Sequence, residues 1–325
     1  MTNQIKLRNL GKSDIKITPI GLGCWQFSKR ANFAGKFWPN LDDGLILDIV
    51  KVSLAGGINW FDTAELYGNG TSERLLSKSL QAEGIEPGEV IICTKWSPIF
   101  RTASNIGRTI DVRLACLEPF PIDLYMVHQP FGFSSEKKEM EAMAKLVRDQ
   151  KIRHVGVSNF SASKMRNSWE TLQKSGISLQ VNQVQYNLLN RKIETNGILE
   201  TARELGITIV AYSPLAQGLL TGKFHDNPEL IKKTGYRKYF SMFKPKGLEK
   251  SRPVIELLKS LGLKYERTPS QIALNWLINY HGDLIVAIPG ATKLSHAEEN
   301  AGAMTFKMAI DDMVLLDEVS KGFRG

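Results

Sequence analysis

Short apolar runs alternate with longer amphipathic stretches along most of the chain. Each short run holds about five nearly continuous apolar, often β-branched residues, which is typical of strands covered on both faces. The longer stretches have apolar residues at helical spacing, and some begin with start signals such as Thr268-Pro269. The pattern predicts strands at 20–24, 59–62, 90–94, 122–128, 154–158, 179–183, 208–212 and 284–288, and helices at 43–54, 72–82, 105–117, 136–149, 161–174, 194–205 and 270–279.

Eight strands with intervening helices favour a closed (β/α)8 TIM barrel of the α/β class over an open sheet. Residues 5–18 are expected to form an N-terminal β-hairpin that turns near Gly11 and plugs one end of the barrel. Residues 213–252 are expected to form a long connection, and 311–321 an extra C-terminal helix that packs outside. No internal repeat, low-complexity tract or linker interrupts the chain, so we expect a single domain over residues 1–325.

Composition argues against several classes of protein. The chain has 42% hydrophobic residues, enough for a full-sized core, but no apolar run of about 18 residues that would cross a membrane. Its polar first residues do not resemble a secretion signal, so we expect a cytoplasmic protein with no membrane partner, either a monomer or a weak homo-oligomer. Three distant cysteines and five scattered histidines match no disulfide or metal pattern, so we expect no metal.

The net charge of +9 is unevenly distributed. Between Lys223 and Arg252 nine Lys and Arg residues face three acids, so this segment alone carries +6. A uniformly basic surface would suggest nucleic acid, which we do not expect here. A local basic segment suggests one anionic ligand, such as a phosphorylated cofactor, although a solvated basic loop explains the charge equally well.

Four polar residues lie at or just after the ends of predicted strands, where a parallel barrel builds its active face: Asp62, Tyr67, Lys95 and His128. A charged residue at the end of an apolar strand is costly to bury unless it is paired, so Asp62 and Lys95 are expected to pair. A nearby ammonium favours phenolate, so we expect Lys95 to lower the pKa of Tyr67 towards the working pH and make it a general acid. His128 would then orient a substrate carbonyl.

Each of these residues has an ordinary alternative role when it is taken alone. Asp62 would suit a helix or turn cap, Lys95 a surface position, Tyr67 a buried aromatic contact, and His128 a structural role. Their occurrence together at successive strand ends favours catalysis.

Longer motifs around these residues resemble the signatures of the aldo-keto reductase superfamily. They include FDTAELYG at 61–68, Thr94-Lys95, DLYMVH at 123–128, GVSNF at 156–160, NQVQYN at 182–187, YSPLAQGLLTGK at 212–223, IPG at 288–290 and Glu299-Asn300. The matches run in the family's order from Leu7 to Asn300. The YSPLAQG and IPG forms are more similar to the branch with bacterial general-stress reductases and potassium-channel β-subunits than to the aldose-reductase branch.

The resemblance implies a catalytic tetrad of Asp62, Tyr67, Lys95 and His128, with Tyr67 as the proton donor. It also implies that hydride passes from NADPH to an aldehyde or ketone, the expected small-molecule substrate. The positions that match the family's NADPH-binding residues are Cys24, Trp25, Asp62, Ser158, Asn159, Gln183, Tyr212, Ser213, Pro214, Leu215, Ala216, Gln217, Gly218, Leu219, Lys223, Gly290, Ala291, Thr292, Lys293, His296, Glu299 and Asn300.

The residues themselves agree with this placement of the cofactor. Phosphate sites in barrels commonly lie in the loops after strands seven and eight, which hold Lys223 and Gly290. The run Gly21-Leu22-Gly23 lacks the third glycine of a Rossmann fingerprint. The chain departs from the family at Cys24, Gln129 and His296 and in the inserted loop 29–40. Aromatic residues in the loops of the active face are expected to line the substrate pocket: Trp25, Phe33, Trp38, Trp96 and Phe131.

Two other functions compete with carbonyl reduction. The first is an NADPH-binding sensor or channel-associated subunit with little turnover, against which the complete tetrad argues. The second is a Schiff-base lyase that uses Lys95, but an adjacent Asp62 would keep that lysine protonated and non-nucleophilic.

Overall fold

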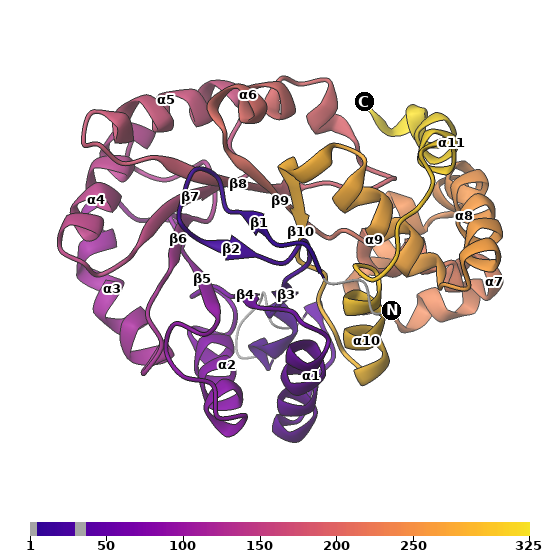
Figure 1. The fold of residues 1–325 in the computed structure, drawn as a ribbon, viewed down its shortest axis with the longest axis horizontal. Coiled ribbons are helices and arrows are strands. Elements are labelled where there is room, and N and C mark those ends of the chain that lie inside the picture. Colours follow the sequence, from indigo (N-terminus) through magenta and orange to yellow (C-terminus); the bar gives the residue numbers. More distant parts are fainter. Residues whose placement is uncertain (1–4, 30–36) are drawn as a thin grey trace.

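The computed structural model describes residues 5–29 and 37–325, and within these ranges eight parallel strands form one sheet. In chain order they are β3 (Leu22–Gly23), β4 (Trp60–Asp62), β5 (Ile91–Trp96), β6 (Leu124–Val127), β7 (His154–Ser158), β8 (Leu179–Gln185), β9 (Thr208–Tyr212) and β10 (Ile285–Ala287). Each strand pairs with its neighbour in sequence, and parallel bridges from Ile20 to Ala287 and from Gly23 to Gly290 join the two edges. The predicted (β/α)8 barrel is therefore confirmed (Figure 1).

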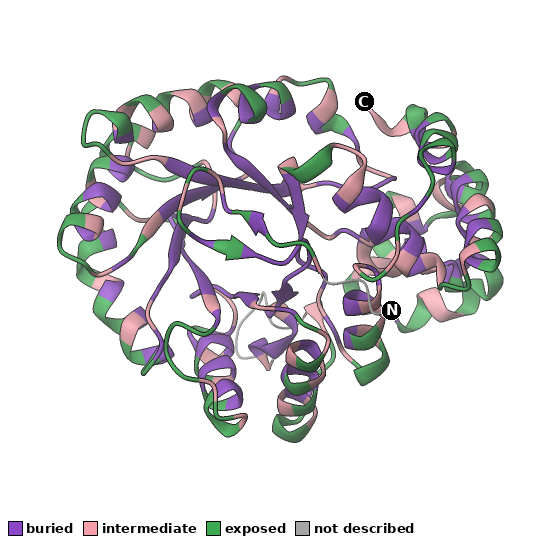
Figure 2. Cartoon of the chain, viewed as in Figure 1, coloured by how far each residue is buried: buried purple, intermediate pink, exposed green. Residues whose placement is uncertain are grey.

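Helices surround the sheet, and their outward faces are exposed while the strands are buried (Figure 2). Helices α1 to α6 and α9 match the seven predicted helices, with shifts of a residue or two at most ends. Helix α6 is the exception, because its predicted start at 194 falls in a short 3-10 turn. The bounds are α1 Asp43–Ala55, α2 Thr71–Ala82, α3 Ser104–Leu117, α4 Glu136–Arg148, α5 Ala162–Gln173, α6 Ile198–Leu205 and α9 Pro269–Asn279.

Part of the predicted connection at 213–252 is wrong, because helix α8 (Pro245–Tyr265) begins inside it. Pro245 occupies the first helical position, where a proline's fixed φ suits the helix and its missing N–H is not needed. Pro253 and two glycines obscured the helical pattern in the sequence. Before α8, the connection consists of 3-10 turns and the short helix α7 (Lys223–Asp226). Helix α10 (Leu294–Gly302), after β10, was also missed.

The N-terminal residues form the expected antiparallel hairpin of β1 (Arg8–Asn9) and β2 (Lys16–Ile17). Leu10, Ile15 and Ile17 of this hairpin are buried in one apolar cluster with the inward-facing side chains of the barrel. Gly11 turns the chain with a φ of 59°, and its N–H donates to the Thr208 hydroxyl at 2.8 Å. The hairpin therefore closes the amino end of the barrel and leaves the carboxyl end for the site.

The C-terminal helix α11 (Ile310–Ser320) packs against α8 and is held through the buried Arg191. The Arg191 guanidinium donates to both carboxylate oxygens of Glu194 at 2.7 Å, and it also contacts the Asp317 carboxylate. Arg324 makes further ion pairs to both acids. No helix in the described part of the chain is long and apolar enough to span a membrane.

Replacing Arg191 with Met should destabilise the protein by about 3 kcal/mol, because Glu194 and Asp317 lose their buried cation. Arg324 remains beside both acids and limits the loss. Denaturant unfolding of the variant and of Arg166→Met, which breaks an exposed ion pair, provides the comparison. Equal stability of the Arg191→Met variant and the unmodified protein would contradict a structural role for this cluster.

Candidate active site

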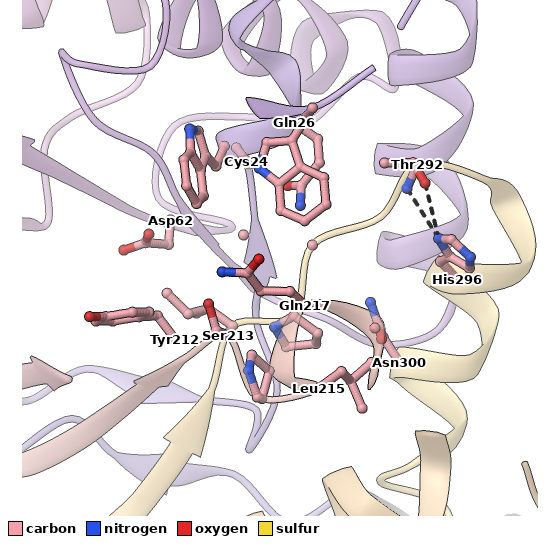
Figure 3. A pocket seen from close by; sticks show the side chains of 18 of the residues that line it. Cys24, Gln26, Asp62, Tyr212, Ser213, Leu215, Gln217, Thr292, His296 and Asn300 are labelled. Atoms are coloured by element: carbon pink, nitrogen blue, oxygen red, sulfur yellow. Dashed lines mark hydrogen bonds between the residues drawn. The ribbon is translucent and has the colours of Figure 1, made fainter. Parts of the chain in front are cut away.

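A cavity of about 760 Å³ opens at the carboxyl ends of the strands. In Figure 3, Asp62 and Tyr212 lie at one end of it and Thr292 and His296 at the other, with Gln217 between them. The residues that line it come from the loops after nearly every strand. The predicted residues among them are Cys24, Trp25, Trp38, Asp62, Tyr67, His128, Ser158, Asn159, Gln183, Tyr212, Ser213, Pro214, Leu215, Gln217, Gly218, Lys223, Gly290, Thr292, His296, Glu299 and Asn300.

The floor of the cavity holds a buried ion pair. Lys95 Nζ donates to Asp62 Oδ1 at 2.6 Å and to the Thr63 carbonyl oxygen at 2.7 Å. Gln183 donates its amide to the second Asp62 oxygen at 2.8 Å. Burial lowers the pKa of Lys95, but the adjacent Asp62 outweighs this and the pKa is raised, so the lysine stays charged.

Tyr67 extends from the loop after β4 over this ion pair, and its hydroxyl lies 3.5 Å from Lys95 Nζ. Burial raises the pKa of Tyr67 to about 12, and the Lys95 ammonium only partly offsets that rise. The expectation that Lys95 lowers this pKa towards the working pH is therefore wrong. Burial deprives the phenolate form of more hydration free energy than its attraction to the Lys95 ammonium returns. The phenol therefore keeps its proton.

His128 lies edge-on to the Tyr67 ring, with ring centroids 5.7 Å apart. Burial and the nearby Lys95 ammonium hold the pKa of His128 well below its usual range, so the imidazole is neutral. Its Nδ1 is buried and has no hydrogen-bond partner among the described residues. Tyr67 and His128 thus present two uncharged polar groups to the same end of the cavity.

A hydrogen-bonded row follows the ends of the next strands. Tyr212 donates its hydroxyl to Asn159 Oδ1 at 2.9 Å, and Ser158 donates to the Gln183 carbonyl oxygen at 3.0 Å. Asn159 Nδ2 also lies 3.4 Å from Gln129 Oε1, and Gln129 lines the cavity as well. These contacts fix the amide and hydroxyl groups along one wall.

The far end of the cavity is basic. Burial lowers the pKa of Lys223, and the positive charges of Arg237 and Lys293 lower it further, while Glu299 opposes them. Burial also lowers the pKa of His296, and the positive charges of Lys223 and Lys293 lower it further. Cations gathered in this way repel one another, so this end is suited to a strongly anionic ligand.

Two side chains with buried polar atoms, one midway along the cavity and one near its basic end, line the cavity wall. Gln217 Oε1 and Asn300 Nδ2 are buried and have no hydrogen-bond partner within the described ranges. The backbone at Gln217 and Gly218 takes positive φ values of 55° and 93°, which turns the loop after β9 tightly over the cavity. Together with the basic residues, these polar atoms are available to a long ligand with phosphate groups.

Some predicted residues lie outside the lining. Lys95 is buried behind Asp62 and Tyr67, and Lys293 is exposed at the start of α10, close enough to affect Lys223 electrostatically. Ala216, Leu219 and Ala291 are buried beside the lining residues of their loops.

Two of the five predicted substrate-pocket residues do not reach the cavity, and a third is not described. Trp96 belongs to β5 and is buried in the outer core, where its indole N–H donates to Asn105 Oδ1 at 3.0 Å. The prediction that Trp96 lines the substrate pocket is therefore wrong. Its side chain follows Lys95 in the strand and so points to the opposite face. Phe131 is mostly exposed and does not line the cavity, which is also a correction. Phe33 lies outside the described residues.

Sequence reasoning missed Arg237 and the start of α9 as parts of the cavity wall. Arg237 lies above the Trp38 ring at 4.8 Å and donates to the Gln217 carbonyl oxygen at 3.1 Å. The excess charge of its segment was a signal, but nothing in the sequence distinguished Arg237 from the lysines around it. Thr268 lines the cavity, and its hydroxyl donates to Glu299 at 3.2 Å.

Comparisons with known proteins agree with this geometry. A sequence model of the Aldo/keto reductase family matches residues 19–321. An uncharacterised oxidoreductase of Mycobacterium bovis is 32% identical over 311 residues, which are 95% of this chain and 91% of that protein.

Two solved structures share the fold. The glycerol dehydrogenase of Gluconobacter oxydans has a TM-score of 0.84 and 24% identity, over 98% of this chain and 96% of that one. An aldo-keto reductase from Klebsiella pneumoniae, solved in complex with NADPH, has a TM-score of 0.75 and 24% identity, over 98% and 95% of the two chains. Because the family model spans nearly the whole barrel and its cavity, this protein belongs to the Aldo/keto reductase family.

Proposed function

We propose that this oxidoreductase reduces aldehydes or ketones to alcohols with hydride from NADPH, and that Tyr67 protonates the carbonyl oxygen. The observation that carries this proposal is the Tyr67 hydroxyl at the cavity, 3.5 Å from an ammonium that is itself paired with Asp62. A protonated phenol beside a fixed positive charge is suited to donate a proton as negative charge develops on a nearby oxygen.

NADPH fits the chemistry of the residues present. Lys223, Arg237, Lys293 and His296 would hold its phosphate groups, and the unsatisfied Gln217 and Asn300 side chains supply further polar contacts. Ser158, Asn159, Gln183 and Tyr212 would hold the nicotinamide end beside the ion pair. When bound, the cofactor supplies the hydride.

The protein's own groups then have distinct tasks. Tyr67 holds the proton that the carbonyl oxygen receives, and Lys95 stabilises the phenolate that this transfer leaves. Asp62 keeps Lys95 charged and in position. His128 is neutral, so it can donate one hydrogen bond to the carbonyl oxygen without competing as an acid.

The Schiff-base alternative fits poorly, because it needs a neutral lysine and the raised pKa of Lys95 keeps it protonated. Steady-state turnover distinguishes a reductase from an NADPH-binding sensor with little turnover. We expect steady-state turnover of a simple aromatic aldehyde with NADPH, whereas a sensor would bind the cofactor and leave the aldehyde unchanged.

Replacing Tyr67 with Phe should lower kcat for carbonyl reduction about a thousandfold, because only the transferable proton is removed. NADPH affinity, measured by quenching of tryptophan fluorescence, should change little. The exposed Tyr239 provides a control, since Tyr239→Phe should retain full turnover. Substantial turnover in Tyr67→Phe would show that another group gives the proton.

The pH dependence of kcat at saturating NADPH and aldehyde should be flat between about pH 7 and 10, because saturation removes the effect that Lys223, whose pKa is lowered, has on cofactor affinity. Reduction needs protonated Tyr67, so activity is lost only as the pH rises towards its pKa of about 12. His128 is already neutral at pH 7, because its pKa is depressed, so it adds no acidic loss in this window. A basic loss centred near pH 8 would contradict the raised Tyr67 pKa.

Lys293→Ala should weaken NADPH binding about tenfold and leave NADH binding nearly unchanged, because the exposed lysine adds a charge beside Lys223 and His296. Fluorescence titrations at low and high salt would measure both affinities, and the difference should shrink in high salt. The exposed Lys307 offers a matched control in Lys307→Ala. Equal losses for both cofactors would mean that Lys293 does not act on the 2′-phosphate.

A further inference from the structure

One surface segment carries far more positive charge than the cavity uses. Between Glu229 and Glu249 the chain has no acid and six basic residues: Lys232, Lys233, Arg237, Lys238, Lys244 and Lys246. Arg237 is turned inward to Trp38 and Gln217 and belongs to the cavity. The other five are lysines at the surface, and among the described residues only Lys232 of these five forms an ion pair, to Glu229 at 2.5 Å.

Two of these lysines lie at the amino end of helix α8, where a positive charge destabilises the helix. Lys244 is the N-cap residue of α8, and Lys246 is in the first turn of that helix. This first turn contains no acid. The amino end of a helix carries partial positive charge, so cations there are unfavourable. Their positive charge is therefore not explained by the stability of α8.

The same segment exposes aromatic rings beside the lysines. Tyr239 is 65% exposed, and the Lys238 and Lys244 ammonium groups lie 5.1 and 5.6 Å from its ring centroid. The next residue, Phe240, is also exposed. Lysines interleaved with exposed aromatic rings are typical of segments that lie in the interface of a membrane.

A second group of exposed apolar side chains lies on the loops after β5 and β6. Phe100 is 84% exposed and Phe133 70% exposed, with ring centroids 6.2 Å apart, and Ile99 and Phe131 are exposed beside them in sequence. Phe100 also has a φ of 57°, an unusual conformation for an aromatic residue. Neither packing nor local backbone preference accounts for this ring in solvent.

Both groups lie on one end of the barrel but on opposite sides of it. All these loops follow the carboxyl ends of parallel strands, and in Figure 1 α3 and α4 lie across the barrel from α8. A small ligand or a short peptide would touch one group, whereas a broad flat partner would touch both.

We propose that the carboxyl-end face of the barrel docks onto an anionic lipid bilayer, with Tyr239 and Phe240 on one side and Phe100 and Phe133 on the other entering its interface. The surface charge comes from lysines, which suit a diffuse negative surface, while arginine is the usual residue for paired contacts to nucleic-acid phosphates. The ammonium groups over Tyr239 also leave less of that ring open for stacking on a base. The attachment is peripheral.

Co-sedimentation of the full chain with vesicles tests this docking. We expect binding to phosphatidylcholine vesicles that contain about a third phosphatidylglycerol, loss of that binding in high salt, and little binding to phosphatidylcholine alone. Each lysine near such a surface strengthens partitioning about fivefold. The combined variant Lys233→Gln, Lys238→Gln, Lys244→Gln and Lys246→Gln should therefore bind about six-hundredfold more weakly.

Matched variants keep the result interpretable. Lys12→Gln, Lys16→Gln, Lys51→Gln and Lys174→Gln remove the same charge at the opposite end of the barrel and should bind nearly as well as the unmodified protein. Tyr239→Ser with Phe240→Ser, and separately Phe100→Ser with Phe133→Ser, should each weaken vesicle binding several-fold. Thermal unfolding would confirm that each variant is folded.

Three outcomes would overturn the proposal. The first is vesicle binding that is equally strong without anionic lipid or in the segment's lysine variant. The second is salt-sensitive binding of the protein to a single-stranded RNA oligonucleotide that is tighter than its binding to the vesicles. The third is a dimer in light scattering that the aromatic variants abolish, because the exposed rings would then serve contacts between two copies.

Discussion

The buried ion pair between Lys95 and Asp62 is the interaction on which the site depends. Neither charge is stable in an apolar interior alone, so each requires the other and the surrounding hydrogen bonds. These come from the Thr63 carbonyl and the Gln183 amide. Lys95 and Asp62 lie on the neighbouring strands β5 and β4, whereas Gln183 lies on β8 across the barrel, so the complete hydrogen-bonded set forms only when the barrel closes. The fold and the chemistry of the cavity therefore share one requirement.

The cavity is electrically divided along its length. At one end the charges of Asp62 and Lys95 cancel, and the groups presented to a ligand, Tyr67 and His128, are neutral. At the other end Lys223 is surrounded by further cations. A ligand with an anionic half and an uncharged reactive half therefore has one favourable orientation. This polarity positions the ligand before any specific hydrogen bond forms.

The sequence predicted the barrel and brought most of the site together, because strand ends in a parallel barrel converge on one face. The sequence-based prediction failed where the position of a residue depends on its burial or on the face of the strand to which its side chain points. Trp96 follows Lys95 directly, so the alternation of a strand turns it into the outer core. Arg237 could not be separated from its neighbouring lysines by charge alone. Helix α8 was hidden by Pro253 and its glycines, whose cost is met by packing onto α9 and α11.

The raised pKa of Tyr67 changes how Lys95 is understood to act. Sequence reasoning places an ammonium beside a phenol and predicts a strong acid, because spacing says nothing about how much water the cavity wall removes. In the structure, desolvation wins, and the phenol keeps its proton until a stronger base develops. Negative charge on a substrate oxygen is such a base, and Lys95 stabilises the phenolate only once the proton has begun to move. The lysine thus acts more on the transition state than on the resting protein, which is the condition for raising kcat.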